Sequence, residues 1–213
     1  MSEASFRFTH AITRRPPRSA VMGLRAENQG DPDIDTMLVH HQQYVEALEG
    51  AGVSVTVLDA LEEFPDSLFV EDTALCLPEV AVVLRPGAPT RAGESAAMAP
   101  ALASVYSTVI ELVGPGTIEG GDILTTGREV LVGLSERTTL AGVEELSKAL
   151  APWGYSVRGV ETPAGVLHFK TESSLLDDTA ILATRQLADS GAFEGYTVVE
   201  VQPGEEAAAN SIR

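Results

Sequence analysis

A unit of strand, tight turn, strand, helix and strand recurs along this chain, and no other feature restricts its fold as strongly. The first copy spans residues 69–112, the second spans 117–160 and the third spans 166–201, while a fourth begins at Glu205. Each copy opens on a polar entrance, and successive entrances are 50, 48 and 40 residues apart. The entrance residues are Asp72, Asp122, Lys170 and Asn210.

The residues before the first copy form a related unit. Phe6–Thr13 is predicted to be a strand, and a helix is predicted after Pro32, with Gly50 and Gly52 ending it. Val53–Leu58 alternates between apolar and polar residues, as a half-buried strand does. With this unit included, the sequence predicts four whole modules and the opening of a fifth.

Repeated modules of this kind, set around a centre, build propeller-like assemblies whose polar entrances converge on the axis. Helices are predicted at about 93–106 and 139–150 in the first two copies. We therefore expect an α/β propeller-like domain over residues 1–213, with its last module incomplete. Because an open ring leaves a strand edge unpaired, we expect a C-terminally shortened form. The alternative is a naturally complete chain that closes through a partner.

Three carboxylates interrupt the otherwise apolar stretch 64–77, namely Asp66, Glu71 and Asp72. The apolar residues of this stretch indicate a strand, and a carboxylate at the mouth of a buried strand is desolvated unless a cation faces it. That cation is either another side chain or a ligand. The alternative is that each acid lies on a solvated loop.

The second entrance, Gly114–Ile123, contains Glu119 and Asp122 separated by two glycines. Gly120 and Gly121 allow positive φ and close backbone approach, so both carboxylates can point inward from one tight loop. No Gly-Lys-Ser/Thr follows, which excludes a phosphate loop. Carboxylates alone would permit a metal, but His and Cys at metal-ligand spacing are absent from the sequence, so no metal site is predicted.

His168 opens the third module between Leu167 and Phe169, at the position where the other modules present acids. Facing Glu119, it would serve as a general acid or base near neutral pH. The alternative is a structural histidine. His10, His40 and His41 have no such placement; the last two are interpreted as helix surface, and Cys76 as core.

The charge balance restricts the partners. Thirty-one Asp and Glu against 14 Lys and Arg give a formal charge of −17, which disfavours nucleic acid and anionic membranes and suits a cationic small molecule. The single cysteine allows no internal disulfide and fits a reducing compartment. The N-terminus has no apolar signal region, and no later run reaches the length of a membrane span. We expect a cytoplasmic protein, and the sequence leaves a homodimer open.

Five segments in order, FPDSLFVED, RPGAPTRAGE, GTIEGGDIL, LSERT and LHFK, are similar to signature segments of the dimethylarginine dimethylaminohydrolase family. The resemblance covers essentially the whole chain. It implies the five-bladed α/β propeller, or pentein, fold. It also implies hydrolysis of Nω-methylated arginines to citrulline and a methylamine, without metal or organic cofactor.

The resemblance also implies roles for individual residues. Asp72 would receive the substrate guanidinium with Glu71 beside it, because carboxylates match the N–H edges of a guanidinium. Asp66 would accept the α-ammonium group, and Leu24 would add a backbone contact from the loop that covers the site. The remaining roles fall on two pairs: Arg91 and Arg137 would bind the α-carboxylate, and Glu119 would orient His168, the proton donor to the departing amine.

The family's nucleophile is a cysteine close to its C-terminus, and no residue of this chain matches it. The resemblance gives Cys76 no catalytic role, so without the family cysteine we expect binding but no turnover. Two alternatives stay open: a catalytically inactive binder of arginine-like cations, and an arginine deiminase or amidinotransferase of the same fold. The FVED and LHFK segments favour the dimethylarginine branch.

Overall fold

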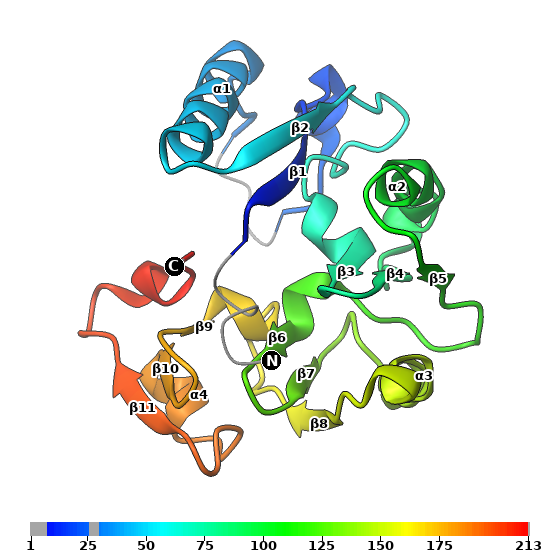
Figure 1. Cartoon of the computed structure of the whole chain (residues 1–213). Coiled ribbons are helices and arrows are strands. Elements are labelled where there is room, and N and C mark those ends of the chain that lie inside the picture. Colours follow the sequence, from blue (N-terminus) through cyan, green and yellow to red (C-terminus); the bar gives the residue numbers. More distant parts are fainter. Residues whose placement is uncertain (1–7, 26–29, 213) are drawn as a thin grey trace.

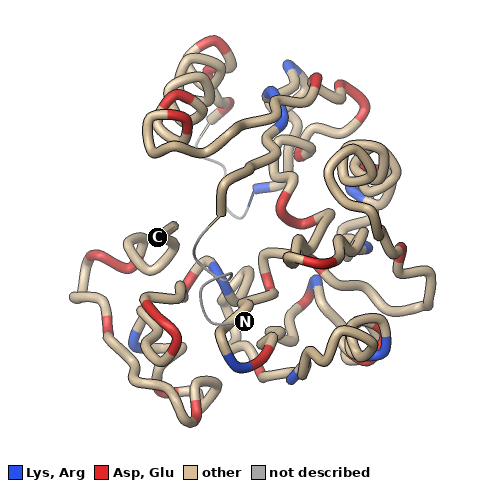
Figure 2. Tube along the Cα trace, in the orientation of Figure 1, with Lys and Arg blue, Asp and Glu red and all other residues tan. Residues whose placement is uncertain are grey.

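The computed structural model describes residues 8–25 and 30–212, so the expected strand start at Phe6 lies outside the described residues. Four small sheets lie around a common centre with their helices toward the periphery (Figure 1). Acidic residues are spread over all parts of this ring, including the turns near its centre (Figure 2). The arrangement is the propeller-like α/β fold that the sequence predicts.

Three modules have the same order of elements: a 3-10 turn, two antiparallel strands, a helix and a third strand parallel to the second. The first contains η2 (Val70–Thr73), β3 (Ala74–Cys76), β4 (Ala81–Val83), α2 (Glu94–Ala103) and β5 (Val109–Glu111). The second contains η4 (Gly120–Asp122), β6 (Ile123–Thr125), β7 (Val130–Leu134), α3 (Leu140–Leu150) and β8 (Val157–Glu161). The third contains η6 (Phe169–Thr171), β9 (Ser173–Leu175), β10 (Ala180–Ala183), α4 (Arg185–Ala188) and β11 (Thr197–Glu200).

The N-terminal unit contains fewer elements than these modules. It comprises β1 (His10–Arg14), α1 (Ile34–Gly50) and β2 (Ser54–Leu58), with β1 parallel to β2. Within the described residues β1 has no antiparallel neighbour, unlike β4, β7 and β10. Among residues 8–25 and 30–212, three modules therefore have the full set of elements and the N-terminal unit has fewer. After Glu205, where the sequence predicts the start of the next module, the structure has a 3-10 turn, η7 (Glu206–Ala209).

Local sequence explains where the longer helices begin and end. The Asp33 carboxylate accepts the backbone N–H groups of Asp35 and Thr36 at the start of α1, and Gly52 adopts φ +90° just after its end. The Thr139 hydroxyl accepts the N–H of Gly142 at the start of α3. No helix in the described parts of the chain is both long enough and apolar enough to cross a membrane.

The apolar run 69–77 departs from the strand that the sequence predicts. Residues 70–73 form the 3-10 turn η2, and only 74–76 pair as a strand. The Thr73 hydroxyl donates to the Val70 carbonyl oxygen at 2.7 Å, which stabilises the turn. Glu71 and Asp72 therefore lie on a turn near the centre of the ring, as do Gly121 and Lys170 in the next two modules.

The hydrophobic core lies between neighbouring modules. Leu75 and Val82 of the first module pack with Val132 and Leu146 of the second. A second cluster joins the second and third modules through residues that include Leu131, Phe169, Ile181 and Leu187. A third joins the first module to the N-terminal unit through residues that include Val83, Met98, Ile12 and Leu58. Because each cluster draws on two modules, packing fixes how the central turns are placed relative to one another.

Candidate active site

The central turns surround a cavity with a volume of about 960 Å³. Seven of the eight residues singled out in the sequence line it: Leu24, Asp66, Glu71, Asp72, Arg91, Arg137 and His168. The eighth, Glu119, is fully buried behind His168. The repeat thus brings together residues that lie far apart in the sequence.

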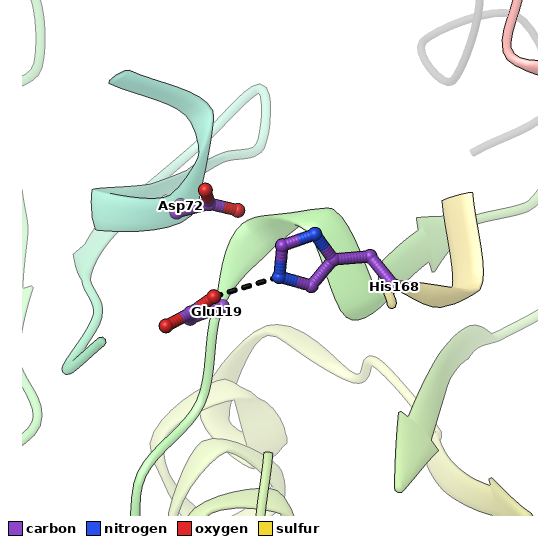
Figure 3. A group of neighbouring side chains, drawn as sticks. All are labelled: Asp72, Glu119 and His168. Atoms are coloured by element: carbon purple, nitrogen blue, oxygen red, sulfur yellow. Dashed lines mark hydrogen bonds and ion pairs between the residues drawn. The ribbon is translucent and has the colours of Figure 1, made fainter. Parts of the chain in front are cut away.

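His168 and Glu119 form the closest pair at this centre. The Nε2 atom of His168 lies 2.7 Å from Oε2 of Glu119 (Figure 3). The other oxygen, Oε1, accepts the N–H of Gly87 at 2.8 Å and lies 3.6 Å from Nη1 of Arg137. Gly87 is required for this approach, because a Cβ there would lie 2.5 Å from the carbonyl oxygen of Arg137. Glu119 is thus held on both oxygens.

The charges around this pair shift both pKa values. Burial lowers the pKa of His168, but the hydrogen bond with Glu119 and the negative charges of Asp72 and Asp122 outweigh it, so the pKa is raised above 6.5. Burial raises the pKa of Glu119, yet the hydrogen bonds from His168 and Gly87 lower it below 4.5 overall. The site therefore favours an imidazolium beside a carboxylate, which is a competent proton donor.

Asp72 faces the same point from the first module. Its Oδ2 pairs with Nη1 of Arg91 at 2.5 Å, and its Oδ1 accepts the N–H of Gly121 at 2.9 Å. One potential ligand atom from each of Asp72, Glu119 and His168 lies within 4.8 Å of the other two, and the three side chains point toward one another (Figure 3). Three turns, each from a different module, converge here.

These three atoms are close enough to hold a metal ion. However, His168 and Glu119 are hydrogen-bonded to each other, so a metal bound by both would replace that bond. Asp72 is already paired with Arg91 and a divalent ion would lie close to this guanidinium. The arrangement fits an acid–base pair beside a cation site better than a metal centre, and the absence of a metal stays a prediction.

Arg91 is held mainly by a residue that the sequence reasoning missed. Glu94 accepts from Nε and Nη2 of Arg91, and Nη2 also donates to the carbonyl oxygen of Phe69. Burial lowers the pKa of Arg91, but Glu94 and Asp72 raise it overall. Glu94 is itself 2% exposed, and burial raises its pKa. The spacing of three residues at the start of a helix could have signalled this pair.

Partners are also present for the other two acids of the first entrance. Asp66 accepts the N–H of Leu24 with its two oxygens at 3.0 and 3.3 Å, which joins the loop after η1 (Arg18–Met22) to the cavity. Glu71 is exposed and pairs with Nζ of Lys170 at 2.6 Å. Thus Arg91 faces Asp72, Lys170 faces Glu71 and a backbone amide faces Asp66.

The structure corrects three sequence-based assignments. Asp122 is buried and points away from the cavity, toward Ser135, Thr138 and the N–H of Phe169. Cys76 is exposed and lines the cavity rather than belonging to a core cluster. His41 also lines the cavity rather than the outer surface of α1, and burial lowers its pKa.

The glycines at 120 and 121 also act differently from expectation. Neither adopts positive φ, since both lie outside the set of glycines with left-handed backbone. Close approach is what requires them. A Cβ on Gly120 would lie 2.0 Å from the Glu71 carbonyl oxygen, and one on Gly121 would lie 2.8 Å from Asp72 Oδ1 and His168 Cγ.

Comparison with known sequences identifies several similar proteins. Residues 61–158 match the family model described as arginine deiminase. The chain is 36% identical over 206 residues to N(G),N(G)-dimethylarginine dimethylaminohydrolase of Pseudomonas aeruginosa, which covers 96% of this chain and 81% of that protein. It is 35% identical over 180 residues to the Streptomyces coelicolor protein of the same name, covering 84% and 69% of the two chains.

Comparison with solved structures identifies proteins of the same name and others of the same fold. A cysteine-to-serine variant of the Pseudomonas aeruginosa enzyme with citrulline matches with a TM-score of 0.91 and 36% identity, covering 96% of this chain and 80% of that one. A histidine-to-glycine dimethylarginine dimethylaminohydrolase, as an adduct with S-methyl-L-thiocitrulline, matches with a TM-score of 0.89 and 35% identity, over the same shares. The N-terminal domain of a cyanobacterial arginine dihydrolase matches at 18% identity with a TM-score of 0.80, which shows a shared fold.

Proposed function

The chain belongs to the dimethylarginine dimethylaminohydrolase family, and from this premise we propose that it takes part in hydrolysing Nω-methylated arginines to citrulline and a methylamine. The observation that carries the proposal is the convergence of Asp72, Glu119 and His168 from three modules on one side of the central cavity. This arrangement supplies a site for a flat cation next to a proton donor.

In the proposed complex the substrate guanidinium lies against Asp72, with Glu71 beside it. Both carboxylates line the cavity, and carboxylate oxygens match the planar N–H edges of a guanidinium. Asp72 keeps its contacts with Arg91 and the Gly121 N–H while it accepts the ligand, because each carboxylate oxygen has a second lone pair. Glu71 exchanges Lys170 for the substrate cation, which its exposed position permits.

The amino-acid end of the substrate is assigned to other residues that line the cavity. We place the α-ammonium group on Asp66, beside the Leu24 backbone that already contacts this carboxylate. The α-carboxylate is assigned to Arg137 and Arg91, both of which line the cavity. Arg91 donates to Glu94, Asp72 and the Phe69 carbonyl oxygen, so Arg137 is the more available of the two cations.

His168 is assigned the proton transfer. Its Nε2 is committed to Glu119, which leaves Nδ1, on the Asp72 side of the ring in Figure 3, to protonate the departing amine. A thiolate attacks the guanidinium carbon, a C–S bond forms, and the C–N bond to the methylamine breaks as Nδ1 delivers its proton. Water then displaces the thiolate from the thiouronium and citrulline is formed. No metal or organic cofactor is required by this sequence of steps.

The resemblance assigns the attack to a cysteine near the C-terminus of the family, and none of residues 1–213 matches it. Residues 1–213 are therefore expected to bind the ligand without turnover, and a turnover assay requires protein that contains such a cysteine. We also propose that the protein acts in the cytoplasm on a small cationic ligand and binds no nucleic acid, which its charge of −17 and single cysteine support.

The test is citrulline formation from asymmetric dimethylarginine, monomethylarginine and arginine, measured in parallel. We expect the two methylated substrates to react and arginine to react much more slowly. Equal or faster turnover of arginine would identify a deiminase instead. Calorimetric binding of dimethylarginine without citrulline formation, in protein that contains such a cysteine, would identify an inactive binder.

A further inference from the structure

Asp122 is the one carboxylate of the second entrance that the proposed reaction does not use. It is fully buried, and its Oδ1 accepts the N–H of Phe169 at 2.9 Å. Its Oδ2 accepts the hydroxyls of Ser135 at 2.7 Å and Thr138 at 2.6 Å. Within the described residues no Lys or Arg forms an ion pair with it. A buried carboxylate held only by neutral donors requires an explanation.

Burial raises the pKa of Asp122 above its ordinary value, while the hydrogen bonds from Thr138, Phe169 and Ser135 act in the opposite direction, and the direction of these bonds favours the ionised carboxylate. The Ser135 hydroxyl already accepts the N–H groups of Arg137 and Thr138, so its own proton is donated to Asp122. The Thr138 hydroxyl accepts the N–H of Glu119 and likewise donates to Asp122. Since Phe169 also donates, Asp122 accepts three hydrogen bonds and donates none, which is the pattern of an ionised carboxylate.

The same bonds tie together three segments of the proposed site. Phe169 directly follows His168, so the Asp122 carboxylate fixes the backbone of the turn that presents the imidazole. Thr138 connects the carboxylate to the backbone of Glu119. Ser135 connects it to the backbone of Arg137. The Asp122 carboxylate is thus hydrogen-bonded, directly or through one hydroxyl group, to the backbone at or next to His168, Glu119 and Arg137.

We infer that Asp122 is a positioning residue for the Glu119–His168 pair: it holds the backbone of both partners in register and supplies negative charge behind the protonated imidazole. The inference rests on the acid–base role proposed above for His168. It extends that role to a residue that touches neither substrate nor the reacting atoms.

Charged side chains from several turns surround His168. Glu119 and Asp122 act from the second module and Asp72 acts from the first. Lys170 stands two residues away on the same turn as His168 but is paired with Glu71. Arg91 and Arg137 lie behind Asp72 and Glu119 respectively. Removing the charge of Asp122 alone leaves every other one of these groups in place.

The test is an NMR titration of the histidine side chains in the 213-residue chain and its variants, with the His168 signal assigned by its loss in His168→Gln. In Asp122→Asn the shape of the side chain is kept, but its one carbonyl oxygen can replace only one of the two carboxylate oxygens, so either the Phe169 N–H or the Ser135 and Thr138 hydroxyls lose their acceptor. We expect the pKa of His168 to fall by about one pH unit. We also expect citrulline binding, measured by calorimetry, to weaken several-fold.

A matched control is available at Glu145. This carboxylate also bridges neighbouring modules through backbone N–H groups, accepting from Val113 and Gly114 at 2.7 Å, but it lies outside the cavity lining. Glu145→Gln is expected to lower stability and leave the pKa of His168 unchanged. Ser135→Ala keeps the Asp122 carboxylate but removes one of its hydroxyl donors and the acceptor of the Arg137 and Thr138 N–H groups, so it should weaken citrulline binding while lowering the pKa of His168 less than Asp122→Asn does.

An unchanged His168 pKa and unchanged citrulline affinity in Asp122→Asn, with a stability loss like that of Glu145→Gln, would overturn the inference. If Asp122→Asn does not fold, Thr138→Val takes its place, because it cuts the link to Glu119 and keeps the charge; an unchanged His168 pKa there would overturn the inference equally. The titration needs no turnover, so failure of dimethylarginine hydrolysis would refute the proposed function without deciding this result.

Discussion

The first and second modules each open on a turn whose aspartate is hydrogen-bonded to the backbone of the next module, but the two aspartates have different roles. In each, an aspartate on the 3-10 turn accepts an N–H from the turn of the next module: Asp72 from Gly121 and Asp122 from Phe169. Asp72 pairs its second oxygen with a buried arginine and lines the cavity. Asp122 gives its second oxygen to two hydroxyls and is fully enclosed.

The difference shows how one repeat yields both scaffold and site. Both aspartates form a hydrogen bond that joins consecutive turns, and these bonds fix how the turns are placed around the axis. The group that binds the second carboxylate oxygen then decides whether the aspartate lines the cavity or is enclosed. Arg91 is anchored by Glu94 and leaves Asp72 at the cavity wall, whereas Ser135 and Thr138 close over Asp122 and remove it from the ligand.

The largest expected effect follows from removing Asp72, the member of this pair of aspartates that lines the cavity. Asp72→Ala leaves Arg91 buried with Glu94 as its remaining ion-pair partner and orphans the Gly121 N–H. We expect loss of detectable dimethylarginine binding by calorimetry and a decrease of about 3 kcal/mol in the free energy of unfolding by urea.

Asp72→Asn separates the two roles of this residue. Its carbonyl oxygen can still accept the Gly121 N–H, so most of the stability should be kept while affinity is lost. Retained affinity for dimethylarginine in Asp72→Ala would show that the guanidinium binds elsewhere, and that the two aspartates are both scaffold residues.

The second prediction concerns the group that both aspartates face. His168→Ala removes the proposed proton donor and leaves Asp72 and its arginine in place. In protein that contains the family cysteine we expect citrulline formation to fall by roughly 10²–10⁴-fold, the usual contribution of general acid catalysis. Dimethylarginine affinity should change little. A variant that keeps its rate but loses affinity would mean that His168 binds substrate rather than transferring a proton.

The sequence predicted the repeat and its helices, and the resemblance named seven of the residues that line the cavity. Thr139 was expected to open a helix and caps it, and the cavity lining contains all the predicted substrate-binding residues. The repeat and the helices depend on local patterns, which are capping, periodicity and turn residues that any segment carries within itself, whereas the substrate-binding roles rest on the resemblance and stay predictions.

The misassigned residues depend on partners distant in sequence. The 3-10 turn at 70–73 was predicted as strand because the stretch around it is apolar, while its geometry is stabilised by bonds such as that from Arg91 to the Phe69 carbonyl oxygen. Asp122 was expected to face the cavity, but Ser135 and Thr138 turn it away. Cys76 was assigned to the core because strand alternation gives two faces without saying which one a neighbouring module covers.

A smaller effect is expected from pH, and it reports on the Glu119–His168 pair. The pKa of His168 is raised above 6.5 in the folded state, so its stabilisation is complete below about pH 6.5 and is lost as pH rises through the raised value. The pKa of Glu119 is lowered below 4.5, so its stabilisation is present above about pH 4.5 and is lost as pH falls through the lowered value. The pair should contribute most between these limits.

The measurement compares wild type with His168→Gln in urea unfolding from pH 5 to pH 8. We expect the difference in unfolding free energy to be about 1–2 kcal/mol near pH 5.5 and to shrink above pH 7. Asp122→Asn, examined in the same way, should reduce the difference. If the difference instead grew with pH, His168 would be stabilised as the neutral imidazole.

The smallest effect is expected at the third module, whose turn presents a cation where the first presents acids. Lys170 pairs with Glu71 at 2.6 Å, but the Glu71 side chain is 61% exposed, so Lys170→Met should change the free energy of unfolding by less than about 1 kcal/mol. Removing Lys170 also releases Glu71 and takes a like charge away from the substrate cation. Dimethylarginine should therefore bind a few-fold more tightly, and the gain should diminish at high salt. Citrulline, whose side chain is neutral, should bind as before; an equal change for both ligands would mean that Lys170 shapes the cavity rather than setting its charge.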